Sequence, residues 1–252
     1  MLPGHCTKTG RGGLKQARGL PLVPNVHSGA GVITTVGFLE EAARAVCHRL
    51  PGLTPIVDGA ALLCWRCTGI YAGAALAALF VILRGRLGRG LPGRRGLALL
   101  VIWAAPLVVD EILVTLGVWD PPGWWRLVTG ALGGAALMLI ALGLLGGSWR
   151  RARARRNGEH LWPSDGVVGG VEAGLLPPVV CVILTGCSLL GEAGLWVLEP
   201  LGLIGVLAAF STAGALLLSP WPPLTRGGWW GYGAGSVFIG LAVWAILWLL
   251  RW

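Results

Sequence analysis

The chain has 252 residues, of which 55% are hydrophobic and only 12% are charged. A soluble domain of this length needs more charge to cover its surface, so the composition excludes an ordinary soluble globular protein. The net charge of +9 comes mostly from arginines that lie in short segments between apolar blocks. Arginine placed in this way is a signal of membrane topology, so we expect contact with a lipid bilayer and no nucleic-acid partner.

The first part of the chain is basic and rich in glycine and proline. Residues 1–36 are predicted to be a disordered tail, and they lack the apolar core of a secretory signal peptide. Residues 37–50 are predicted to form a short helix at the membrane surface. Glu40 and Glu41 lie in its first turns, where the helix dipole favours acidic residues, and Pro51 ends it.

Six apolar segments follow, each close to the roughly 20 residues that cross the hydrocarbon core as a helix. They cover about 68–83, 96–118, 127–147, 171–190, 200–218 and 233–250. Tryptophans cluster at their ends, as in the aromatic belt of membrane proteins. Within lipid the backbone must satisfy its own hydrogen bonds, and a helix does so. The sequence therefore predicts an all-α, polytopic transmembrane helix bundle of about six spans, preceded by the short surface helix.

Pairs of glycines with GxxxG spacing occur in two of the predicted spans. Gly69 and Gly73 lie in the first span, and two pairs, Gly130 with Gly134 and Gly143 with Gly147, lie in the third. Small residues with this spacing let two membrane helices approach closely, so we expect these pairs to mark helix–helix contacts.

The arginine-rich loops follow the first, third and fifth predicted spans, so they share one face of the membrane. The positive-inside rule places that face in the cytoplasm, which makes residues 148–166 a basic cytoplasmic loop and puts both termini outside. Basic residues in the N-terminal tail oppose its export. A membrane-dipping element at Leu53 to Leu63 is the alternative that would keep the tail inside.

A group of thiols precedes the first span. Cys64 and Cys67 form a C-x-x-C, the spacing by which two thiolates grip one tetrahedral metal, and Cys47 and His48 could supply the remaining ligands. Adjacent residues on a helix point about 100° apart, so Cys47 and His48 could bind one ion only with an irregular backbone. The same residues also fit a disulfide or redox dithiol, or cysteines that only pack. Zinc and iron are the metals that we expect if a metal is bound.

The pattern C-H-R-x-P, followed by C-x-R-C-T-G-I-Y-x-G, resembles a family of small prokaryotic membrane proteins catalogued as a domain of unknown function (number 2085). The matching residues are Cys47, His48, Arg49, Pro51, Gly59, Leu63, Cys64, Arg66, Cys67, Thr68, Gly69, Ile70, Tyr71 and Gly73. A weaker match follows at Asp110, Arg126, Thr129, Gly130 and Gly133. The sequence departs from the family at Leu53-Thr54, where an Arg-Ser pair is usual.

The resemblance covers about residues 45–135 and implies a location in a prokaryotic cytoplasmic membrane. We accordingly divide the membrane part into a family-like domain, 37–147, and a three-span region, 167–252, that lies outside the resemblance. The family has no established activity. The resemblance therefore implies neither a substrate nor a partner, and whether the chain forms a homo-oligomer stays open.

Topology brings further polar residues to the face that carries the thiols. Asp110 lies about eight residues before the predicted end of the second span, and carboxylates inside a membrane are functional candidates. We predict that one polar pocket gathers Arg49, Arg66, Asp110, Glu111 and Arg126 beside the cysteines. An ion pair of Asp110 with Arg66 or Arg126 that serves only to join helices is the alternative.

No catalytic motif emerges, so the sequence favours a non-enzymatic protein. Its leading interpretation is a membrane protein with a Cys/His metal site, structural or sensing, above an intramembrane carboxylate. A membrane thiol-disulfide oxidoreductase, a small transporter that uses Asp110 and Glu111, and a scaffold without chemistry stay open.

Overall fold

The computed structural model describes residue 47 and residues 63–157, 166–219, 234–242 and 245–246. Its helices are α2 (Trp65–Leu83), α3 (Arg94–Thr115), α4 (Gly123–Asn157), α5 (Gly170–Leu189) and α6 (Glu192–Leu218), and residues 234–242 are also helical. The predicted tail, the predicted surface helix other than Cys47, and part of the sixth predicted span lie outside the described residues.

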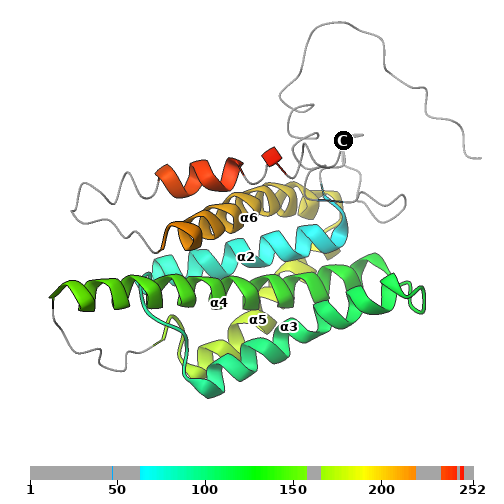
Figure 1. Ribbon diagram of the computed structural model, residues 1–252. Coiled ribbons are helices and arrows are strands. Elements are labelled where there is room, and N and C mark those ends of the chain that lie inside the picture. The colour runs from blue at the N-terminus through cyan, green and yellow to red at the C-terminus, as the bar shows by residue number, and fades with distance from the viewer. Residues whose placement is uncertain (1–46, 48–62, 158–165, 220–233, 243–244, 247–252) are drawn as a thin grey trace, which may run out of the picture. The chain divides into compact units, whose positions relative to one another are not determined.

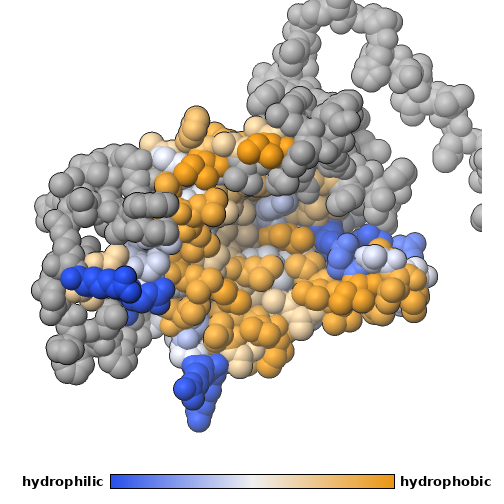
Figure 2. Space-filling view, viewed as in Figure 1, coloured by the Kyte–Doolittle hydropathy of each residue, from blue (hydrophilic) through white to orange (hydrophobic). Residues whose placement is uncertain are grey.

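Five helices in the described part of the chain are long and apolar enough to cross a membrane. They correspond to the first five predicted spans, which confirms the all-α polytopic bundle. Many of their large apolar side chains face outward, among them Val101, Ile102 and Val182. Figure 2 shows apolar residues over the middle of the visible face and hydrophilic residues towards its edges. Lipid tails, rather than water, are the natural surroundings of such a surface.

α4 is longer than the sequence predicted. The apolar block ends near Gly147, but the helix continues to Asn157 through the arginine-rich segment. Residues 148–157 are therefore helical and not part of a loop. The physical reason is that arginine and alanine are good helix formers, and a helix that has already begun extends at little cost.

The closest helix packing joins α2 to α4, and in Figure 1 α2 lies between α4 and α6. A Cβ atom added at Gly130 would lie 2.5 Å from the Arg66 carbonyl oxygen, and one at Gly73 would lie 2.6 Å from that of Ala131. A Cβ atom at Gly69 or Gly134 would likewise collide with the facing backbone. The first two predicted GxxxG pairs thus meet each other, and their lack of side chains lets the backbones touch. In the third pair, a Cβ atom at Gly143 would lie 3.1 Å from Leu91 in the α2–α3 connection, and one at Gly147 would have no neighbour closer than 3.8 Å among the described residues.

The helices beyond the family-like domain pack directly onto it. α6 lies beside α2, where Gly205 approaches the carbonyl of Tyr71 and Gly202 approaches the Leu63 side chain. α5 contacts α3 and α4, and the Trp103 indole donates a hydrogen bond to the Gly174 carbonyl at 3.1 Å. The main core cluster accordingly includes residues from all five helices.

Ion pairs and hydrogen bonds connect the arginine-rich side of the bundle to the start of α5. Glu172 accepts a hydrogen bond from the Gly169 backbone N–H at 2.8 Å and pairs with Arg84 at 2.9 Å and with Arg86. The Val167 N–H also donates to the Gly90 carbonyl at 2.7 Å. These contacts join the connection between α2 and α3 to the first turn of α5, a role for Glu172 that the sequence did not reveal.

Candidate metal centre at the start of α2

The start of α2 carries the C-x-x-C. Cys64 is the residue at the N-terminal boundary, with the extended backbone angles φ −71° and ψ 160°, and Cys67 lies in the first turn. The first N–H groups of a helix have no partner within the helix, and together with the helix dipole they favour negative charge. A thiolate is therefore less costly at Cys64 and Cys67 than in the middle of a membrane helix.

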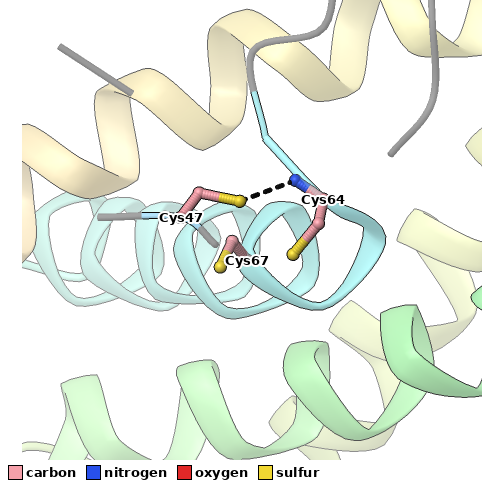
Figure 3. A group of neighbouring side chains, drawn as sticks. All are labelled: Cys47, Cys64 and Cys67. Atoms are coloured by element: carbon pink, nitrogen blue, oxygen red, sulfur yellow. Dashed lines mark hydrogen bonds between the residues drawn. The ribbon is translucent and has the colours of Figure 1, made fainter. Parts of the chain in front are cut away.

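Cys47 completes a thiol cluster, the name used below for Cys47, Cys64 and Cys67. Their three Sγ atoms all lie within 4.8 Å of one another. Figure 3 shows the three side chains gathered at the end of α2, with Cys47 arriving from a segment distant in sequence. No disulfide joins the cysteines that the structure describes. Three sulfurs brought together from two segments could supply three of the four ligands of a tetrahedral metal ion.

The surroundings of the cluster are apolar. Cys47 is 1% exposed and Leu63 is fully buried, and the two half-buried cysteines and Tyr71 pack against them. Burial among apolar side chains makes a net negative charge on these sulfurs costly unless a bound cation or the protein balances it.

Two features bear on the charge of the sulfurs. The Cys64 backbone N–H donates a hydrogen bond to Cys47 Sγ at 3.1 Å, an arrangement that stabilises a sulfur carrying negative charge (Figure 3). The hydrogen bond with the Cys47 side chain raises the pKa of the Cys64 thiol above its ordinary value, and burial raises it further. A thiol of raised pKa holds its proton more tightly, so a cation that binds Cys64 would have to displace that proton.

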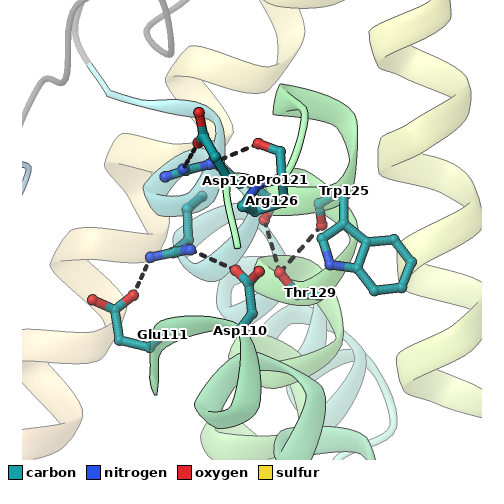
Figure 4. Close-up of polar contacts among 8 residues, drawn as sticks. Asp110, Glu111, Asp120, Pro121, Trp125, Arg126 and Thr129 are labelled. Atoms are coloured by element: carbon teal, nitrogen blue, oxygen red, sulfur yellow. Dashed lines mark hydrogen bonds and ion pairs between the residues drawn. The ribbon is translucent and has the colours of Figure 1, made fainter. Parts of the chain in front are cut away.

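Arg66 lies between the two cysteines in sequence and reaches α3. Its Nη2 lies 2.5 Å from Asp110 Oδ2, and its Nη1 pairs with Glu111 (Figure 4). The Arg66 side chain is 11% exposed and the Asp110 side chain only 2%, whereas Glu111 is 59% exposed. We call these three residues the Arg66 network. An ion pair of the intramembrane carboxylate with Arg66 or Arg126 was the alternative to the predicted polar pocket, and the structure contains such a pair with Arg66.

Arg126 makes a different set of contacts. Its Nη2 pairs with Asp120 Oδ1 at 2.9 Å and its Nε donates to the Pro121 carbonyl at 3.1 Å (Figure 4). Its side chain is buried, while that of Asp120 is exposed. Asp120 was not among the predicted site residues. It lies six residues before Arg126, in the connection between α3 and α4, and this short separation could have suggested the pair.

The predicted site residues that the structure describes thus fall into three groups. These are the thiol cluster, the Arg66 network and a separate pair of Arg126 with Asp120. α3 ends at Thr115, so Asp110 lies five residues, or about 8 Å, from its end, closer to the thiol-bearing face than the predicted eight residues. The candidates His48 and Arg49 lie outside the described residues.

Two further cysteines, Cys181 and Cys187, lie in α5 and pack against the main core cluster. Cys181 Sγ lies 4.0 Å from Thr185 Oγ1, within its own helix. They are six residues apart on one helix, and neither belongs to the thiol cluster. Their contacts are those of packing residues.

The thiol cluster and the Arg66 network both lie inside the segment of this chain that matches a known protein family. A rat (Rattus norvegicus) protein described as "Prostaglandin E2 receptor EP1 subtype" is 31% identical over 169 residues, which cover 58% of this chain and 42% of the receptor. The chain thus spans less than half of the length of that receptor. No solved structure gives a significant match. Residues 47–140 match the family described as "Predicted membrane protein (DUF2085)", the family that the cysteine pattern resembled.

Proposed function

We propose that this chain is a multi-pass membrane protein that holds one zinc or iron ion in the thiol cluster, in a structural or sensing role. The observation that carries the proposal is the approach of Cys47, Cys64 and Cys67 to within 4.8 Å of one another. Zinc–sulfur bonds of about 2.3 Å in a tetrahedral site separate neighbouring sulfurs by about 3.8 Å. Small side-chain rotations would bring the three thiols to that spacing.

His48 is the proposed fourth ligand. Cys47 itself lies outside regular secondary structure, which meets the requirement that its backbone be irregular if neighbouring residues are to bind one ion. Three thiolates and one imidazole form a common structural zinc site. In this proposal the ion fastens the segment around Cys47 to the first turn of α2, above the intramembrane Asp110.

Two of the three alternative functions, the oxidoreductase and the transporter, have less support. A redox dithiol needs only the two cysteines of the C-x-x-C, whereas the third sulfur, that of Cys47, is a feature that a metal site uses. A transporter that uses Asp110 and Glu111 needs carboxylates available to a cation, but both are paired with Arg66. We place the protein in a prokaryotic cytoplasmic membrane with its arginine-rich loops inside and its termini outside, as loop charge favours.

Metal analysis of the wild-type protein tests this proposal. Protein purified in detergent without chelators should contain close to one zinc or iron per chain, and removing the metal should make additional thiols reactive towards an alkylating reagent. Metal-free protein with all of its thiols reactive would contradict the proposal. Metal-free protein whose thiols appear only after reduction would favour the oxidoreductase.

A further inference from the structure

We propose that Arg66 is a positioning residue for the metal centre. Through its ion pairs with Asp110 and Glu111 on α3, it holds the first turn of α2 in the orientation that directs Cys64 and Cys67 towards Cys47. This inference rests on the proposed function and adds a coupling between the metal centre and the intramembrane carboxylates.

The first turn of α2 needs an anchor of this kind. Its boundary residue Cys64 makes no side-chain capping hydrogen bond, and the first turn contains no acidic residue. An uncapped helix end frays, and a cation such as Arg66 near the positive end of the helix dipole would weaken it further. Pairing with two carboxylates reverses that effect and fixes the turn to a neighbouring helix.

Arg66 and the cysteine Cys67 point in different directions from the first turn of α2. Arg66 and Cys67 are adjacent on a helix of 3.6 residues per turn, so their side chains point about 100° apart. The Arg66 side chain meets α3, while Cys67 packs with Cys47 and Leu63. A rotation of the first turn that released Arg66 would therefore also turn Cys67 away from Cys47.

The Arg66–Asp110 ion pair is buried, and this makes it costly to break. The Asp110 side chain is 2% exposed, and among the described residues its Oδ1 atom has no hydrogen-bond partner, while its Oδ2 atom pairs with Arg66. Breaking a buried ion pair leaves an uncompensated charge, which is costly. By linkage, a metal that holds the first turn in place must also strengthen the Arg66–Asp110 pair. Binding of the metal would thus affect the Arg66–Asp110 ion pair inside the membrane.

Cobalt binding tests the inference. Co²⁺ replaces zinc in thiolate sites, and its absorption bands report both the sulfur ligands and their geometry. Metal-free protein in detergent is titrated with Co²⁺ for the wild type, Asp110→Asn and Arg66→Lys, with Asp120→Asn as a control that removes the carboxylate paired with Arg126. We expect Asp110→Asn and Arg66→Lys each to weaken binding by about 10- to 100-fold and to shift the ligand-field bands. Asp120→Asn should change neither.

The outcomes separate the two proposals. Wild-type affinity and wild-type bands in Asp110→Asn and Arg66→Lys would overturn the positioning role and leave the metal centre intact. A wild type that binds no Co²⁺ would overturn the metal centre and, with it, this inference. Since Arg66→Lys keeps a positive charge beside Asp110, it carries the test if Asp110→Asn does not yield monodisperse protein.

Discussion

Replacing both Cys64 and Cys67 by serine is expected to remove the bound metal from the protein completely. The change takes away two of the three sulfurs that converge at the start of α2. A serine hydroxyl does not ionise near neutral pH and is a poor ligand for zinc or iron, so Cys47 would be left as a single thiolate. Metal content by mass spectrometry, measured beside the wild type, gives the result directly.

The matched control for this variant lies in α5. Replacing Cys181 and Cys187 by serine removes the same number of thiols from a membrane helix, but from positions that only pack against the core. We expect this control to keep the wild-type metal content. Equal metal in all three proteins would show that the ion is held elsewhere and would refute the assignment of the thiol cluster.

The second large effect concerns the contact between α2 and α4. Gly134→Ala is expected to lower the free energy of unfolding by about 1–3 kcal/mol, as overpacking of a close contact does. The added methyl group would collide with the backbone carbonyl of Ile70, and neither backbone can give way without separating the two helices. Because Arg66 and Cys67 lie one turn before Ile70, the metal centre should loosen as well.

Gly186→Ala in α5 is the control for that substitution, because nothing lies within 4 Å of a methyl group added there. Alanine is the better helix former, so this variant should be as stable as the wild type or more stable, by up to about 1 kcal/mol. Thermal unfolding in detergent compares the two. Equal effects of the two substitutions would mean that the GxxxG contact does not hold the helices together.

Much of this architecture could be predicted because it depends on patterns local to the sequence. Runs of apolar residues located five helices, and glycine spacing identified the α2–α4 contact. The ends of the helices were less predictable. α4 continues ten residues beyond Gly147, since the limit of the apolar run marks the edge of the membrane and not the end of the backbone hydrogen bonding.

Contacts between residues far apart in the sequence were the hardest feature to predict. The C-x-x-C spacing identified Cys64 and Cys67, and proximity in sequence to the first span suggested Cys47. The choice of Arg66 over Arg126 as the partner of Asp110 depends on how α2 is rotated against α3 and α4, which a single sequence does not encode locally. The link from Glu172 to Arg84 and Arg86 spans almost ninety residues and has no sequence motif.

The most direct test of the central claim is X-ray absorption spectroscopy at the metal edge of the purified, metal-containing protein. A site built from Cys47, Cys64 and Cys67 predicts a first shell dominated by about three sulfur atoms, at about 2.3 Å if the metal is zinc. A first shell made only of oxygen and nitrogen atoms would contradict the thiol centre and would place the ion elsewhere in the protein.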